Sequence, residues 1–256
     1  MSVTETLYTA RFELPELIER GRLQTLMCRV YRSGALVAPT SGTVSIYKAD
    51  GSSVVAAAAV TVASSIATYA IAAATTTSLS VEEGWIIEWE LTIAGVVSTF
   101  RNDAALVRRR LYPVITDADL FLRWKALDPS SATCITSQTT YQDQIDAAWL
   151  DIQRRLIRNG NRPNLVMEPS ALYEPHLLLV GAMIYEDLAS RLNDAYMAIS
   201  DKQRQHYETA WRSLQFRYDR DDDGTADSLT SKRAAVPTVW LNSAGPRNVG
   251  RPGYPR

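Results

Sequence analysis

The sequence predicts an α+β protein with a β-rich N-terminal part, a helical part and an extended C-terminal arm. Up to Leu111, short apolar runs alternate with a period of two between turn signals. From Tyr112 onward, apolar residues recur at helical spacing. After Ser228, four prolines and three glycines exclude a helix of any length. The expected modules are residues 1–111, 112–228 and 229–256.

The clearest strand of the first module is expected over residues 85–93, where Trp85, Trp89 and the other odd positions form a core face. Alternation predicts further strands in residues 26–30, 44–48, 54–62, 66–72 and 96–101, after a leading segment at residues 7–22. The predicted turns are Ser33 with Gly34, Asp50 with Gly51, Glu83 with Gly84, and Ala94 with Gly95. About seven such strands over about 100 residues are typical of an antiparallel, Ig-like β-sandwich. A partly open barrel is the alternative.

The helical module is centred on residues 141–157, whose apolar side chains share one face. Thr139 or Thr140 is expected to cap this helix, and Asn159 with Gly160 to end it. Three other helices are expected. A short one is capped by Thr116 and broken at Asp128 and Pro129. A second, over residues 171–192, is capped by Ser170, and Pro175 is either tolerated in its first turns or delays its start; a third covers residues 201–218. Gly181 is expected to permit close approach of another helix. Together these segments predict a small α-helical bundle.

Charge is distributed unevenly, although the formal net charge is only -1. Residues 112–228 hold 18 acidic and 12 basic side chains, and every charged residue after Ser228 is basic. The net charge gives no whole-chain case for binding nucleic acid or a membrane. We expect no signal peptide and no membrane span, and two free thiols at Cys28 and Cys134, which fit a reducing cytoplasm.

Three consecutive arginines, Arg108, Arg109 and Arg110, precede Pro113 at the junction of the modules. They form either a solvated linker or an inter-domain or inter-subunit anchor, because guanidinium groups pair well with carboxylates.

An acidic loop follows the helices. Asp219, Asp221 and Asp223 before a glycine reproduce the first half of a calcium loop, and Asp227 is a further ligand position. Thr230 occupies the twelfth position, where a calcium loop needs an acidic residue. The alternatives are bound calcium and a solvated acidic turn; no other cofactor is expected.

The C-terminal arm combines an apolar extended patch with basic residues, which predicts an arm that orders on a partner rather than a plain disordered end. Its expected contact residues are Val236, Pro237, Val239, Trp240, Leu241, Arg247 and Arg251.

No catalytic set is recognisable. The two histidines, His176 and His206, lie in expected helices, and no zinc spacing, phosphate-binding glycine loop or nucleophile elbow is present in the sequence. We expect an interaction or assembly protein rather than an enzyme.

Four segments resemble the helical head–tail connector (adaptor) proteins of tailed bacteriophages over residues 112–227. They read YPVITDADL from Tyr112, YQDQIDAAW from Tyr141, LLLVGAMIYEDLA from Leu177 and YDRDDDG from Tyr218. The N-terminal module resembles Ig-like domains of phage structural proteins, which the smallest connectors lack.

The resemblance implies a virion protein of the neck, assembled in the host cytoplasm as a ring of about twelve copies. The ring would bind the portal protein through the C-terminal arm and the next connector or tail-completion protein on its other side. DNA would pass through its channel without specific binding. The alternative is a baseplate or tail module that binds carbohydrate or the host surface through its β domain, which requires exposed aromatic side chains there.

Overall fold

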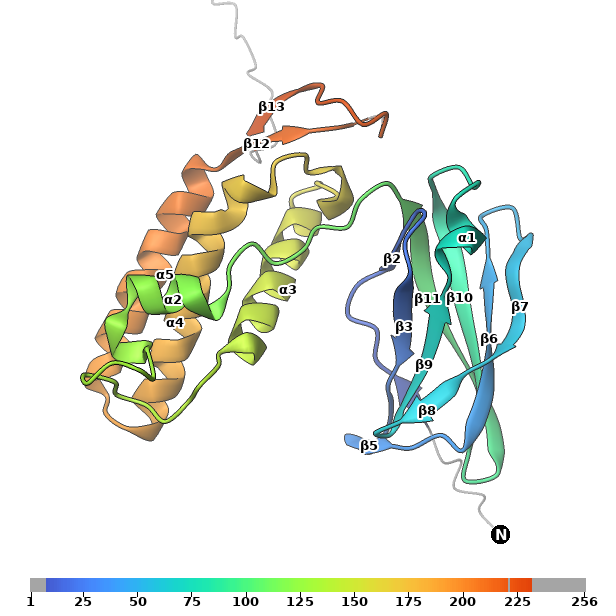
Figure 1. The fold of residues 1–256 in the computed structure, drawn as a ribbon, viewed down its shortest axis with the longest axis horizontal. Helices are drawn as coiled ribbons and strands as arrows, with labels where there is room; N and C mark the ends of the chain where they lie inside the picture. The colour runs from blue at the N-terminus through green and yellow to red at the C-terminus, as the bar shows by residue number, and fades with distance from the viewer. Residues whose placement is uncertain (1–7, 221, 232–256) are drawn as a thin grey trace, which may run out of the picture.

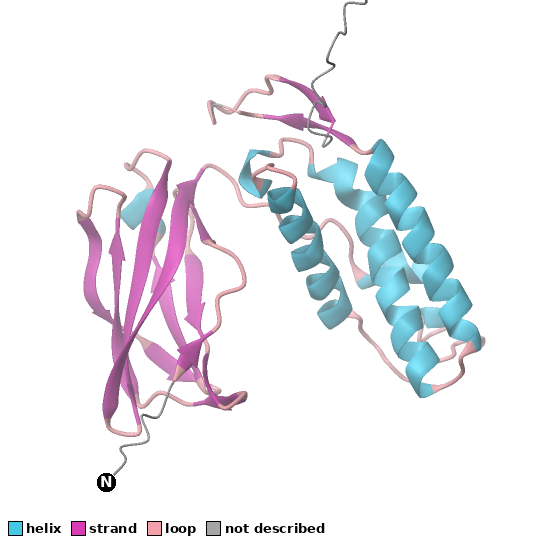
Figure 2. Ribbon diagram, turned by 180° about the vertical axis from the view of Figure 1, so that it is seen from behind, coloured by secondary structure: helices cyan, strands magenta, loops and turns pink. Residues whose placement is uncertain are grey.

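The computed structural model describes residues 8–220 and 222–231 and has a mixed α+β architecture (Figure 1). The β-sheets lie in the N-terminal half and the helices in the C-terminal half, and Figure 2 shows the same separation from behind. The expected α+β class is therefore confirmed. No helix within the described residues is long and apolar enough to cross a membrane.

The largest sheet has five strands in the order β2-β11-β10-β6-β7. These strands are β2 (Glu16–Glu19), β11 (Val96–Val107), β10 (Glu82–Ile93), β6 (Ser41–Tyr47) and β7 (Ser53–Ala59). All neighbours are antiparallel except β2 and β11, which run parallel. A purely antiparallel sheet was expected, and the parallel pair of β2 and β11 corrects that expectation. A parallel pair is possible here because β2 and β11 are far apart in the chain and need no tight turn between them.

Two three-stranded sheets complete this half. One contains β3 (Gln24–Cys28), β9 (Ile66–Ile71) and β8 (Thr61–Ala63). The other contains β1 (Thr9–Ala10), β4 (Val30–Arg32) and β5 (Ala35–Val37). The short helix α1 (Ala73–Thr76) follows β9. Leu26 of β3 and Val30 of β4, one from each smaller sheet, join Ile46 and Trp85 of the large sheet in one buried cluster. Cys28 is buried and Cys134 partly exposed, and both are free thiols, as expected.

Strand β10 confirms the predicted alternation, because its odd positions from Trp85 to Ile93 are all buried. The turn expected at Glu83 and Gly84 is wrong. The register shifts between Glu83 and Trp85, so Gly84 with its φ of +79° forms a β-bulge inside the strand. A glycine at positive φ suits either a turn or a bulge, and the sequence does not distinguish them.

The helical half contains α2 (Asp117–Arg123), α3 (Gln142–Arg158), α4 (Tyr173–Arg191) and α5 (Ala195–Ser213). Three 3-10 turns, η1 (Lys125–Leu127), η2 (Pro163–Leu165) and η3 (Pro169–Leu172), connect them, and the hairpin of β12 (Gln215–Tyr218) and β13 (Ser228–Ser231) follows. Helix α4 is buried on most sides and contacts α2, α3 and α5.

The helix boundaries confirm some expected caps and correct others. Thr116 begins α2, with its backbone N–H and hydroxyl donating to Asp119, and Gly160 ends α3 at a φ of +76°. Tyr141 takes the N-cap position of α3 without a side-chain cap bond. The Thr140 hydroxyl donates to Asp117 and accepts from the N–H of Gln142, the first residue of α3, so it satisfies one N-terminal donor as expected.

Ser170 lies in η3, and α4 begins only at Tyr173, so the expected cap is wrong. Pro175 falls in the first turn of α4, where no intrahelical N–H bond is lost. The last helix was expected to run to residue 218 but ends at Ser213. Leu214, Phe216 and Tyr218 are buried with a period of two, which is the pattern of strand β12 rather than of a helix.

Gly181 of α4 faces the ring of Trp124 rather than another helix. A Cβ atom at this position would lie 2.4 Å from the ring atom Cη2 of Trp124. The close approach expected at Gly181 is therefore made by an aromatic side chain from the segment after α2.

We predict that Gly181→Ala destabilises the fold by about 1–3 kcal/mol, because the clash with Trp124 outweighs the better helix propensity of alanine. Urea unfolding measures the change. In a Trp124→Leu background the same substitution should cost less. An equal loss in both backgrounds would contradict a clash with Trp124.

His176 is fully buried in α4 against Trp149, with ring centroids 4.9 Å apart. Its Nε2 lies 3.0 Å from the carbonyl oxygen of Ile145, so the Nε2–H tautomer donates there. Burial lowers the pKa of His176 from 6.5 to about 4.

Below pH 6.5 the unfolded chain therefore binds a proton that the folded chain does not. We predict that the free energy of unfolding falls by about 3 kcal/mol between pH 6.5 and pH 4 through this residue alone. Comparing His176→Gln with the parent chain in urea at pH 7 and pH 4 isolates the contribution. The matched control is His206→Gln on the exposed face of α5. An unchanged pH dependence in His176→Gln would contradict the assignment.

Candidate functional site

The segment between β11 and α2 joins the two halves and is held at both ends. The Arg108 guanidinium donates to the backbone oxygen of Asp222 over 2.6 Å and lies 3.5 Å from its carboxylate. Arg110 instead pairs within the N-terminal half, with Glu16 at 3.3 Å, while Arg109 is exposed. The three arginines thus have different surroundings, and Arg108 is the one that connects the sheet half to the acidic loop.

Two further bonds fix the same segment. The indole N–H of Trp149 in α3 donates to the backbone oxygen of the buried Leu111 over 3.2 Å. The hydroxyl of Tyr112 donates to the carboxylate of Glu19 in β2 over 2.8 Å. One residue is therefore bound to the helices and the next to the sheet, so the junction is not a free linker.

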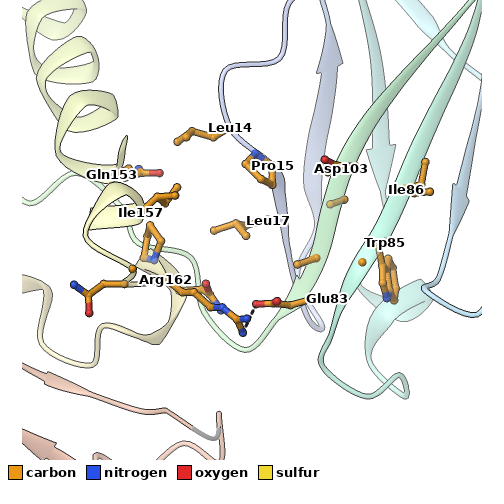
Figure 3. Close-up of a pocket in the computed structure, with 17 residues that line it drawn as sticks. Leu14, Pro15, Leu17, Glu83, Trp85, Ile86, Asp103, Gln153, Ile157 and Arg162 are labelled. Atoms are coloured by element: carbon orange, nitrogen blue, oxygen red, sulfur yellow. Dashed lines mark ion pairs between the residues drawn. The ribbon is translucent and has the colours of Figure 1, made fainter. Parts of the chain in front are cut away.

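Beside this junction, a cleft of about 530 Å³ lies between the sheet half and α3 (Figure 3). Leu14, Pro15 and Leu17 line it on one side, and Ile157 and Pro163 on the other. A volume of several hundred Å³ with mostly apolar walls is typical of ligand and peptide sites.

Two ion pairs span the halves around the cleft. Arg154 of α3 donates to Glu13 over 2.7 Å, and Arg162 lies 2.6 Å from Glu83 (Figure 3). Each pair is solvent-accessible and contributes about 0–1 kcal/mol. The pairs orient the cleft walls more than they stabilise the fold.

Burial raises the pKa of the Glu16 carboxyl, and the nearby Arg110 opposes that rise. Burial likewise raises the pKa of Asp222, against the effect of Arg108. In both cases the arginine favours the charged carboxylate, but its effect on the pKa is smaller than that of burial.

The acidic loop is organised by its own backbone. The Asp219 carboxylate accepts from the N–H groups of Asp223 and Gly224 at 3.1 and 2.8 Å. Asp227 accepts from the Arg220 N–H at 2.5 Å, and Asp223 from Thr225. Asp221 lies outside the described residues. In the part of the chain that the structure describes, no group of three or more metal-ligating side chains is gathered. Calcium binding at this loop stays a prediction.

The arm residues named above, from Val236 to Arg251, all lie outside the described residues. The start of the expected arm is different, because residues 229–231 belong to β13 and pair with β12. The expected boundary at residue 229 therefore falls inside the hairpin of β12 and β13.

Neither a protein-family model, nor a curated protein, nor a solved structure matches this chain.

Sequence reasoning singled out Arg108 but missed its partner and the whole cleft. Glu13 and Arg154 are separated by 141 positions, and Arg108 and Asp222 by 114. No local pattern relates residues so far apart. The one available signal was the apolar Leu14 and Pro15 just before β2, with Leu17 within that strand.

We predict that Arg108→Gln loosens the loop over residues 219–227, because a hydrogen bond from a charged donor is worth about 1.5–3 kcal/mol. Backbone amide exchange in that loop should accelerate by about tenfold or more. Hydrogen–deuterium exchange by mass spectrometry measures it. The neighbouring exposed residue supplies a matched control, Arg109→Gln, which should leave the loop unchanged. Equal exchange in the two variants would contradict the role of Arg108.

Proposed function

We propose that this chain is a structural protein of a tailed-phage virion, a head–tail adaptor that forms a ring beneath the portal, extends the DNA channel and joins head to tail. The resemblance over residues 112–227 supports the proposal. Helices α2, α3 and α4 overlap the first three segments of the resemblance in the same order, and the acidic segment that begins at Tyr218 follows α5. That succession is the observation that carries the proposal.

In this proposal the N-terminal half is an Ig-like β-sandwich and the C-terminal half a small helical bundle. The shared buried cluster of the large and small sheets supports the first assignment. The covering of α4 by α2, α3 and α5 supports the second.

The partners in this proposal are other copies of the chain in a ring of about twelve, the portal protein, and the next connector or tail-completion protein. The arm with Trp240, Arg247 and Arg251 would contact the portal. The protein would assemble in the host cytoplasm and end in the virion neck.

The excess of 18 acidic over 12 basic side chains in residues 112–228 is consistent with a channel wall. On α3, Asp143, Asp146 and Asp151 are all exposed. These acidic residues share their face with Arg154, which pairs with Asp151 over 3.3 Å. Carboxylates repel the phosphates of DNA, so a lumen lined by them would let DNA pass without binding it.

The alternative, a carbohydrate-binding baseplate or tail module, depends on exposed aromatic side chains in the β domain. Trp85 and Trp89, the strongest aromatic candidates there, are each only 1% exposed. Their rings are used in the core and are not available to stack on a sugar.

We predict that ending the chain after Ser231 abolishes binding to the portal, while the fold persists because β13 is retained. Light scattering of the protein, alone and mixed with its portal, measures the change. The full chain should form a ring or join the portal in a fixed high copy number.

The control is the full-length variant Val97→Asp, which changes an exposed residue at the turn between β10 and β11 and should bind normally. Unchanged portal binding after truncation would reject the arm as the contact. A full chain that stays a monomer or trimer indifferent to the portal would reject the adaptor function.

A further inference from the structure

We propose that the cleft between the sheet half and α3 is an internal docking site for residues 236–241 of the same chain, the apolar segment around Trp240. This docking does not depend on the adaptor function, because it concerns the isolated chain. Only its release by a portal would rest on that function.

The cleft offers an apolar surface that the described residues leave uncovered. Ile157 of α3 is 43% exposed and Ile86 of β10 is 37% exposed, and both line the cleft beside Leu14 and Leu17. Figure 3 shows Leu14, Leu17 and Ile157 around the same open space. Burying such side chains contributes about 25 cal/mol per Å² of apolar area, so an apolar occupant is favoured.

The length of chain beyond Ser231 is sufficient to reach the cleft. Strand β13 ends at Ser231, which pairs with Gln215 at the start of β12. The end of β12 is beside the cleft, because the Tyr218 hydroxyl accepts a hydrogen bond from the backbone N–H of Arg162 over 2.9 Å, and Arg162 lines the cleft. The strand β12 is about 10 Å long.

An extended chain covers roughly 3.3 Å per residue, so Ser231 and Val236 are separable by about 17 Å and Ser231 and Trp240 by about 30 Å. The segment therefore reaches back along the hairpin and into the cleft without moving β13. Its tethering to the same hairpin gives it a high effective concentration at this site.

The chemistry of the segment matches that of the walls. It contains Val236, Pro237, Val239, Trp240 and Leu241, without a charged residue. An indole is large and rigid, which makes it an efficient anchor in an apolar cleft. Lys232 and Arg233 precede the segment, and the exposed carboxylates of Glu83 and Asp103 lie at the cleft.

Docking would have a consequence for assembly. A Trp-containing apolar arm is prone to non-specific association when it is exposed. Held in its own cleft, it becomes available only to a partner that binds it more tightly than the cleft does.

Disulfide trapping in the full chain tests the proposal. Gln153→Cys in the cleft wall is combined with Thr238→Cys in a Cys134→Ser background. Cys28 does not compete, since it is buried and burial raises the pKa of its thiol to about 12. The matched control pairs Thr238→Cys with Thr99→Cys, an exposed position on β11 away from the cleft.

We expect an intramolecular crosslink at several-fold higher yield than in the control and independent of protein concentration. Mass spectrometry of linked peptides distinguishes the species. A crosslinked dimer would overturn the proposal by making a second copy the donor. A yield equal to that of the control would overturn it by leaving the cleft without this segment.

Fluorescence gives a second measurement that needs no crosslink. The difference spectrum between the parent chain and Trp240→Ser reports Trp240, whose emission should be blue-shifted by docking. Ile157→Asp should shift that difference spectrum to the red, whereas Val97→Asp, an exposed residue outside the cleft, should not. A difference spectrum typical of solvated tryptophan would overturn the proposal, whatever the portal assay shows.

Discussion

The relation between the two halves depends on how the chain from Arg108 to Tyr112 is held. Leu111 is buried and its carbonyl is bound by Trp149, while Tyr112 is bound to Glu19 of the sheet half. A buried carbonyl must find a donor, so the indole of α3 is placed where the junction requires it. The position of α3 relative to the sheet, and with it the cleft, follows from this constraint.

The contacts around the junction differ in kind. Arg154 with Glu13 and Arg162 with Glu83 are accessible pairs that salt weakens. The Trp149 bond is buried and largely insensitive to salt. The junction thus combines one buried hydrogen bond that salt hardly affects with two ion pairs at the cleft that salt weakens.

Much of the fold was predictable where a local period decides the structure. Strand β10 and helix α3 each show one clear apolar face, and both were placed to within a few residues. The errors came where two structures share one pattern. Gly84 at positive φ fits either a turn or a bulge. Leu214 and Tyr218 also fit the helical spacing of the apolar face of α5, but the buried Phe216 between them gives the period of two of a strand. The cleft could not be predicted, because its walls come from segments about 140 positions apart, and no local signal relates them.

The root of the arm is coupled to the cleft through backbone contacts. Strand β12 is bonded on one side to β13 and on the other to the segment around η2, through the bonds of Met167 to Arg217 and of Asp219 to Leu165. Pro163 of η2 is itself a wall of the cleft. Because hydrogen-bonded strands move together, a pull on the arm beyond Ser231 acts on the same element that forms the cleft wall. Under the proposed function, a partner that binds residues beyond Ser231 would therefore act on the element that forms this wall of the cleft.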